Sequence, residues 1–144
     1  MTLSWLRFQN SNIQEKSRQT TKPLRQISIN RRSNRVLYNV TISVDSLKYE
    51  EWLLFMREEH IPKIFSSLCF ESYRICKILG EEAGGTAVAV QYVAYSTESF
   101  EKYNTEFAPR LQAEHQERFG TSAAAYRTTL EIIEEGHLVD DSVE

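Results

Sequence analysis

Residues 50–62 have the sequence EEWLLFMREEHIP, which is typical of an amphipathic helix. Trp52, Phe55 and Met56 fall on one face at helical spacing, and the charged residues fall on the other. Proline has no backbone N–H, and it moves the residue before it out of the α region. We therefore expect the helix to break or kink just before Pro62.

Such a break would leave His60 near a helix C-terminus, where an imidazole can transfer protons near neutral pH. The alternative is that His60 only caps the last carbonyl groups of the helix. His115 lies between charged neighbours, which favour a solvated helix surface over a ligand contact. His137 lies in an acidic C-terminal segment, and we expect no role for it.

The hydrophobic periodicity predicts six elements, each a strand or a helix. The expected elements are a strand over 36–44, a helix over 46–59, strands over 70–79 and 86–96, a helix over 97–119 interrupted at Pro109, and a strand over 123–133. This order is the β-α-β-β-α-β pattern of ferredoxin-like α+β domains. It predicts a four-stranded antiparallel sheet with two helices on one face.

The sheet face away from the helices is expected to be mostly polar. Its expected members are Asn39, Thr41, Ser43, Arg127, Thr129 and Glu131, with the apolar Ile133. The strand over 86–96 is apolar on both sides, so its facing stays open; if Val88, Val90 and Tyr92 pack under the helices, Gln91, Tyr95 and the apolar Val93 join this face. The apolar members favour partial burial of this face in a homodimer, and the polar members could line a shared cavity.

Arg127 is the better candidate for holding a ligand. A guanidinium on this face, near Gln91 and Asn39, could bind a carboxylate or phosphate through two parallel hydrogen bonds. Alternatively, Arg127 forms an ion pair with Glu131, with Glu82, or with a carboxylate of a partner subunit.

Charge divides the chain into two parts. Residues 1–35 hold eight Lys/Arg against one acid, and residues 36–144 hold nine against nineteen. We interpret 1–35 as a basic, disordered extension, 36–134 as the domain and 135–144 as an acidic tail. A transit peptide, a nucleic-acid arm and an artefact of the assigned gene start are alternatives for the extension.

Several classes of function are disfavoured. No apolar run approaches the roughly 20 residues that span a bilayer, so we expect no membrane partner. The acidic domain lacks the Lys/Arg-Gly-Phe/Tyr signature of RNA-recognition motifs, so we expect no nucleic acid. The two cysteines, Cys69 and Cys76, are too few for a disulfide framework, which fits the cytoplasm, and no metal motif occurs. We expect no metal and no cofactor.

Several short motifs resemble one bacterial family, domain-of-unknown-function family four-two-eight-six. They are Tyr38-Asn-Val-Thr, Glu51-Trp52, Met56, His60-Ile-Pro62, Gln91-Tyr92, Phe107-Ala-Pro109, Leu111, His115, Arg118-Phe-Gly120 and Arg127-Thr128. The likeness spans about 36–134, and it leaves out the basic extension. It implies a relative of the dimeric α/β-barrel proteins, which include small monooxygenases and isomerases, and so a fold and a homodimer, but it implies no reaction.

The leading hypothesis is a homodimeric protein that binds a small anionic or aromatic molecule between sheet and helices, in the manner of a cofactor-independent enzyme. The expected site comprises His60 as the catalytic residue, with Arg127, Gln91, Asn39, Tyr103, His115 and Arg118 binding the ligand. The alternative is a non-enzymatic homodimeric module whose polar sheet face is only the dimer interface. A pocket of several hundred Å³ beside His60 would favour the first.

Overall fold

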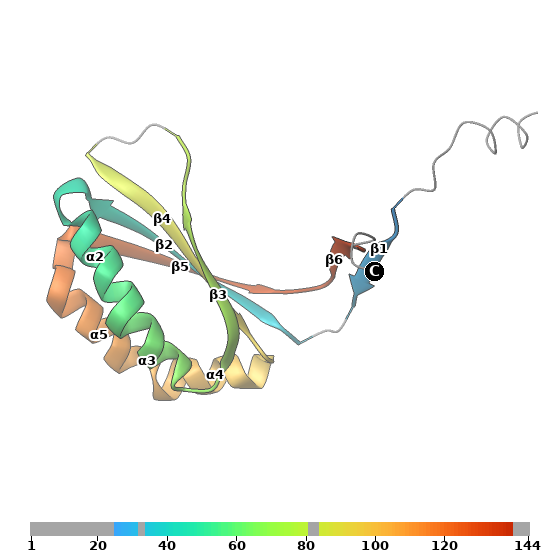
Figure 1. The fold of residues 1–144 in the computed structure, drawn as a ribbon. Helices are drawn as coiled ribbons and strands as arrows, with labels where there is room; N and C mark the ends of the chain where they lie inside the picture. The colour runs from blue at the N-terminus through green and yellow to red at the C-terminus, as the bar shows by residue number, and fades with distance from the viewer. Residues whose placement is uncertain (1–24, 32–33, 81–83, 140–144) are drawn as a thin grey trace, which may run out of the picture. The chain divides into compact units, whose positions relative to one another are not determined.

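The computed structural model describes residues 25–31, 34–80 and 84–139, which fall into two compact units (Figure 1). The larger unit is Arg31–Glu134, and the described residues on either side of it form the smaller unit.

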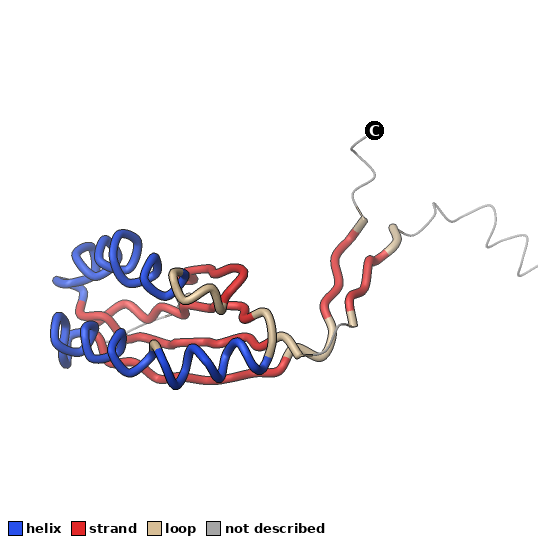
Figure 2. Tube along the Cα trace, turned by 90° about the horizontal axis from the view of Figure 1, so that it is seen from below, coloured by secondary structure: helices blue, strands red, loops and turns tan. Residues whose placement is uncertain are grey.

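The larger unit has the predicted order of elements. It contains β2 (Val36–Asp45), α2 (Tyr49–Phe55), a π-helical turn (Met56–His60), α3 (Ile61–Phe65), β3 (Phe70–Lys77), β4 (Gly85–Ala94), α4 (Thr97–Glu106), α5 (Ala108–Phe119) and β5 (Ala123–Glu131). The strands pair in the antiparallel order β3-β4-β2-β5. Figure 1 shows the helices on one side of this sheet, and Figure 2 shows the two helical rows from below. The prediction of a ferredoxin-like α+β fold is confirmed.

Local signals in the sequence set the helix boundaries. The side chain of Asp45 accepts a hydrogen bond from the N–H of Leu47, and that of Ser96 accepts one from the N–H of Ser99. Both are N-caps, which satisfy backbone donors that the first helical turn leaves free. Pro109 lies in the first turn of α5, where its missing N–H costs nothing, and the chain turns between α4 and α5 at Phe107.

The sequence predicts a break or a kink before Pro62; the structure shows no break there, and the irregularity is a π-helical turn. The helical run continues from Tyr49 to Phe65, because a π-helical turn precedes the proline: the N–H of Ile61 bonds to the carbonyl of Met56, five residues back. A wider turn of this kind accommodates an irregularity in the ladder without ending the helix. His60 is therefore in the middle of a helical run, and it does not cap a C-terminus.

Aromatic side chains dominate the core between sheet and helices. Trp52, Tyr92 and Tyr103 are fully buried. The ring of Phe70 meets that of Tyr103 edge-on at 4.8 Å, and Tyr38 lies 5.9 Å from Tyr92. Such pairs add to the stabilisation that burial itself supplies. The alternating apolar residues of β2 are buried in this core, and Val88, Val90 and Tyr92 of β4 are buried with them, which settles the facing that the sequence left open.

The facing of β5 differs from the prediction. Pairing with β2 places Arg127 opposite Val40 and Ala125 opposite Ile42, both of which point toward the helices. Arg127, Thr129 and Glu131 therefore lie on the helix-covered face, and Tyr126 and Leu130 lie on the open face. The small side chains of Ala123 and Ala125 decide the register, since they occupy the buried end of the strand.

The smaller unit is a pair of antiparallel strands, β1 (Ile27–Asn30) and β6 (Glu135–Leu138). These residues fall in segments that the sequence analysis assigns to a disordered extension and a frayed tail. The structure differs because the two segments satisfy each other's backbone groups, and four-residue strands are too short to give a clear periodic signal. The remaining residues of those segments, 1–24 and 140–144, lie outside the described residues.

No helix in the described part of the chain is both long enough and apolar enough to cross a membrane.

Candidate functional site

A cavity lies between the sheet and the helices of the larger unit. Its walls come from β2, β4, β5, the π-helical turn, α3, α4 and α5: Tyr38, Val40, Ile42, Met56, His60, Ile64, Tyr92, Tyr103, Gln112, His115, Ala125 and Arg127. The atom-free space is about 380 Å³ when the part open to solvent is counted, and the centre of a water molecule can occupy about 20 Å³ of it. A water molecule fits there as the side chains stand. A larger ligand requires a side chain at the opening to move.

Two histidines lie side by side in the wall of this cavity. His60 comes from the π-helical turn and His115 from α5, and their ring centroids are 5.6 Å apart. Both are buried, with 9% and 6% of their surface exposed. The suggestion that His115 lies on a solvated surface is wrong. Its charged neighbours in sequence point outward, while His115 shares the inner face of α5 with Leu111.

Trp52 fixes the position of His115. The indole Nε1 donates a hydrogen bond of 2.9 Å to Nε2 of His115, and both side chains are buried. A buried hydrogen bond between ring nitrogens of α2 and α5 restricts rotation of the imidazole. The Glu51-Trp52 motif therefore contributes a polar contact to the site in addition to apolar packing.

His60 has the most unusual environment of the titratable groups. Its Nδ1 is buried and has no hydrogen-bond partner among the described residues. Burial lowers the pKa of His60 from 6.5 to about 4, with the neighbouring His115 and Arg127 acting in the same direction and Glu114 opposing them. Burial also lowers the pKa of His115, helped by Arg127. Both imidazoles are therefore neutral near neutral pH.

Arg127 carries the one formal charge among the described residues that line the cavity. Its side chain is exposed, and both it and Gln112 hydrogen-bond to the hydroxyl of Tyr38. Burial raises the pKa of Tyr38, and these two hydrogen bonds oppose that shift. Arg127 makes no ion pair with any described residue, Glu131 included, and Glu82 lies outside the described residues. Its guanidinium thus has donors to offer a ligand at the opening.

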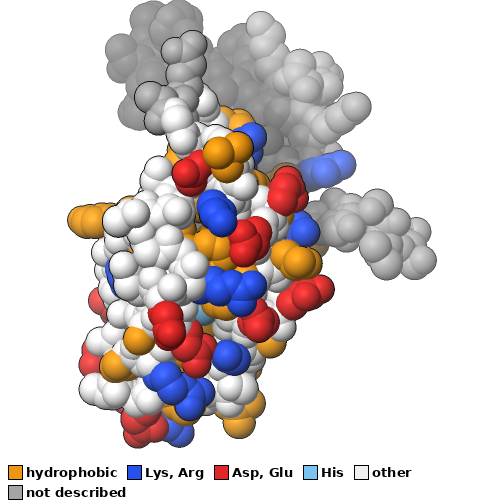
Figure 3. Space-filling model, turned by 90° about the vertical axis from the view of Figure 1, so that its left-hand side faces the viewer, with side chains coloured by type: hydrophobic (Ala, Val, Ile, Leu, Met, Phe, Trp, Pro, Cys, Tyr) orange, Lys and Arg blue, Asp and Glu red, His pale blue; other side chains and the backbone are white. Residues whose placement is uncertain are grey.

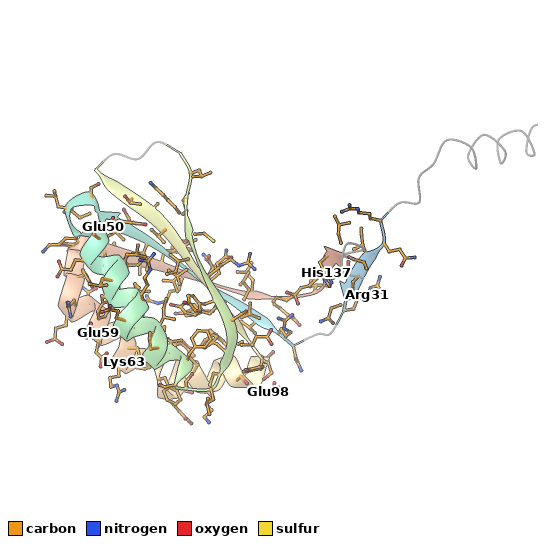
Figure 4. All side chains as sticks on the ribbon, in the orientation of Figure 1. Arg31, Glu50, Glu59, Lys63, Glu98 and His137 are labelled. Atoms are coloured by element: carbon orange, nitrogen blue, oxygen red, sulfur yellow. The ribbon has the colours of Figure 1, made fainter. Side chains whose placement is uncertain are left out.

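Arg118 lies outside the cavity. Its Nη1 is 3.3 Å from Oε2 of Glu59, and its guanidinium lies over the ring of Phe55 at 5.3 Å. Lys63 and Glu114 form a second ion pair between the two helical rows, at 3.0 Å. Figure 4 shows Glu59 and Lys63 on the outer side of the helical run, and Figure 3 shows basic side chains next to acidic ones over the surface.

Asn39 and Gln91 lie on the opposite side of the sheet from the cavity. They are paired in register between β2 and β4, and Nε2 of Gln91 donates to Oδ1 of Asn39 at 3.2 Å. The expectation that Arg127 shares a face with them is wrong, because β5 presents its odd-numbered residues to the helices. The structure thus brings together His60, His115, Tyr103 and Arg127, but not Asn39, Gln91 or Arg118.

Sequence reasoning missed three polar members of the site: Tyr38, Trp52 and Gln112. Tyr38 and Trp52 were treated as apolar core, because their rings follow the hydrophobic pattern. Gln112 is three residues before His115, and residues three apart share a helix face. Gln112 could therefore have been assigned to the site from the sequence if His115 had been expected to point toward the sheet.

No group of three or more His, Cys, Asp or Glu among the described residues is placed to hold a metal ion.

The fold and this cavity define a ferredoxin-like α+β domain with a polar site between its sheet and its helices. The chain belongs to the family described as Domain of unknown function (DUF4286), which it matches over residues 35–133. No curated protein sequence matches it.

Solved structures share the fold. One is a dimeric ferredoxin-like protein from an uncultured marine organism, at 11% identity and a TM-score of 0.50, covering 69% of this chain and 96% of that one. Another is a candidate monooxygenase from Shewanella loihica PV-4, at 15% identity and a TM-score of 0.48, covering 71% and 97%. At these identities the likeness concerns the fold alone.

Proposed function

We propose that this protein binds a small anionic molecule at the cavity between sheet and helices, and that His60 exchanges a proton with it. The observation that carries the proposal is the buried Nδ1 of His60, which lacks a partner among the described residues in the wall of a cavity that Arg127 borders. A buried, unsatisfied nitrogen costs roughly 1–3 kcal/mol. A ligand or water molecule that bonds to it recovers that energy.

Arg127 supports an anion as the ligand. It is the charged group of the cavity lining, and no described carboxylate neutralises it. The neighbouring imidazoles are neutral. A negatively charged group of the ligand can therefore accept hydrogen bonds in the cavity, and no acidic side chain in the described lining repels it. The aromatic rings of Tyr38, Tyr92 and Tyr103 make the rest of the lining compatible with a short organic body.

The size of the cavity limits the ligand. Space for about one water molecule is well below the several hundred Å³ of ordinary ligand pockets. We therefore propose that the exposed Arg127 side chain swings outward as the anion arrives. A compact carboxylate fits this scheme better than a large cofactor does.

The test is a titration of the ¹⁵N-labelled full chain with acetate, pyruvate and benzoate, followed by NMR. Saturable shifts at His60, Gln112 and Arg127 are expected, and Arg127→Ala should move their midpoint to a carboxylate concentration about 10- to 100-fold higher. The matched control is Thr128→Ala, because Thr128 follows Arg127 in β5 but lies on the open face. Absence of saturable binding by all three carboxylates would reject an anion site.

A second function has its own support, a homodimer formed through the open sheet face. Leu37 is paired in register with Val93 on one side and Leu130 on the other, so three apolar side chains form a row across this face. Tyr126, at 72% exposure, adds an aromatic ring. A homodimer would cover this surface and leave the cavity, on the other face, free.

Native mass spectrometry of the full chain tests the dimer directly. We expect a dimer for the wild type and a monomer for Leu130→Asp, since a carboxylate buried without a partner costs several kcal/mol. Leu54→Asp is the control, because Leu54 is exposed on α2, away from the sheet. A wild-type monomer would reject the interface. The same spectrum would reveal any bound small molecule as extra mass.

A cytoplasmic location, suggested by the cysteines, remains a prediction.

A further inference from the structure

The hydrogen bond from Trp52 determines which nitrogen of His115 carries the proton. An indole N–H can only donate, so Nε2 of His115, at 2.9 Å, must accept. A neutral imidazole has one N–H, which then resides on Nδ1. Toward any group other than Trp52, neutral His115 can therefore only donate a hydrogen bond. As part of the wall of the cavity, it cannot act as a base.

His60 has the complementary character. No described residue bonds to its Nδ1, and its ring lies next to that of His115 with the centroids 5.6 Å apart. A neutral imidazole always has one bare nitrogen that can accept a proton. The two histidines therefore differ: the bond from Trp52 fixes the tautomer of His115, whereas no described partner at Nδ1 fixes that of His60, which can present a bare nitrogen as an acceptor.

These two roles, together with the charge of Arg127, define a ligand class. We propose that the cavity takes a small anion that bears an enolisable carbonyl group, with the carbonyl oxygen against His115, the negative group against Arg127 and a C–H bond next to the carbonyl facing His60. The inference rests on the proposed anion-binding function. Trp52 is then a positioning residue, and His60 and His115 are the catalytic residues.

The reaction that follows is enolisation. The C–H bond breaks, and its proton passes to the bare nitrogen of His60. The electron pair forms the carbon–carbon double bond of an enolate, whose oxygen accepts the N–H of His115. Return of the proton to carbon exchanges that hydrogen with solvent, and its delivery to oxygen gives the enol. No oxidant, reductant or cofactor is consumed in either direction.

The tautomer of His115 can be measured without a ligand and without a variant. Two-bond ¹H–¹⁵N correlation spectra of the full chain at about pH 7 distinguish the two neutral forms of histidine from the imidazolium. We expect His115 to show a protonated Nδ1 and a bare Nε2. Finding the proton on Nε2, or on both nitrogens, would overturn the assignment of His115 as the donor.

Pyruvate is the probe for the chemistry, because it is a compact anion with an enolisable carbonyl. Incorporation of deuterium into its methyl group in D₂O, followed by NMR, should be faster with the full chain than in buffer. His60→Ala should remove the acceleration. His115→Phe should lower it by roughly 10²- to 10³-fold, the usual cost of losing one donor to an oxyanion.

His115→Gln is the conservative variant. A Gln amide can still accept from Trp52 through its oxygen and donate to the cavity through its nitrogen, so it should keep the exchange rate within about tenfold of the wild type. Trp52→Phe should give His115 a mixed tautomer spectrum together with slower exchange. Equal rates for the wild type and His115→Phe would overturn the inference, as would wild-type exchange no faster than in buffer.

Failure of this inference is distinguishable from failure of the proposed function. If pyruvate shows Arg127-dependent shifts but no accelerated exchange, anion binding stands and enolisation is rejected. If pyruvate shows no saturable binding while acetate or benzoate does, the anion site stands and the carbonyl class is rejected. If none of the three binds, both proposals fall.

Discussion

The two faces of the sheet differ sharply, although the same strands build both. On the helix-covered face, Tyr38 and Val40 of β2 are buried in an aromatic core that also encloses two histidines. On the open face, Asn39 donates a hydrogen bond to Thr41 of the same strand and accepts one from Gln91 of β4. The polar groups of the open face satisfy one another, whereas the buried face retains a nitrogen without a partner among the described residues.

This difference is the reason for proposing the covered face, and not the open one, as the place of the chemistry. Hydrogen-bonded polar groups on a sheet surface are already stable and need no ligand. An unsatisfied imidazole nitrogen inside a core costs stability, and such costs concentrate at functional sites. The open face is therefore better suited to association, and the covered face to binding a small molecule.

The largest effect is expected from Trp52→Ala. It removes a fully buried side chain and leaves His115 without its donor, so the free energy of unfolding should fall by about 3–5 kcal/mol. Urea denaturation of the full chain measures the loss. Leu54→Ala on the exposed side of the same helix should change it by less than about 0.5 kcal/mol. If Trp52→Ala and Leu54→Ala lowered the free energy of unfolding equally, the covered face would not be more tightly packed than the exposed side of the helix.

The second largest effect is expected from acidification, which should lower the free energy of unfolding through His60 in the covered face. His60 has a pKa of about 4 in the folded protein against 6.5 when unfolded, so between these values the unfolded chain binds more protons. Its contribution is fully present above about pH 6.5 and is lost as the pH falls toward 4, by at most about 3 kcal/mol. Urea denaturation across this range checks it. His60→Gln should flatten the slope, and an unchanged slope would contradict the assignment.

Arg127→Ala should weaken binding of a small carboxylate by about 10- to 100-fold, which corresponds to the 1.5–3 kcal/mol of a hydrogen bond to a charged group. Isothermal titration calorimetry on the full chain measures the dissociation constant. Thr128→Ala, one residue along β5 and on the other face, should leave it unchanged. If both variants weaken binding equally, the contrast between the two faces does not describe the ligand site.

The smallest effect is expected at Arg118. Its ion pair with Glu59 and its contact with Phe55 lie on the solvent side of the helices, where an exposed pair contributes about 1 kcal/mol or less. Arg118→Ala should therefore lower stability slightly and leave carboxylate affinity as it is. A large loss of carboxylate affinity in Arg118→Ala would instead mean that Arg118 belongs to the ligand site, as the sequence predicts.

Much of the fold could be predicted from local signals. The N-caps Asp45 and Ser96, the proline inside α5 and the alternation of β2 are signals that act within a few residues, and the structure contains each of them. The π-helical turn before Pro62 could not be predicted, because proline only forbids certain backbone hydrogen bonds. Whether the helix ends or widens depends on what packs around it.

The candidate site shows the same division. The expected site includes His60, Arg127, Tyr103 and His115, and the cavity brings these four together, although the sequence neighbours of His115 favoured a solvated surface for it. Asn39 and Gln91 were misassigned to it, since the pattern of β5 allows either face to be buried. A shift of one residue exchanges the two faces of a strand.

The sequence by itself determined the order of the elements, their caps and the residue types available for chemistry, because these depend on short-range sterics and hydrogen bonding. Only the tertiary structure decided that β5 turns Arg127 toward the helices, that Trp52 bonds to His115, and that Nδ1 of His60 is left unsatisfied. Each of these joins residues far apart in the chain. Their energies come from burial and from pairing across elements, which no local pattern encodes.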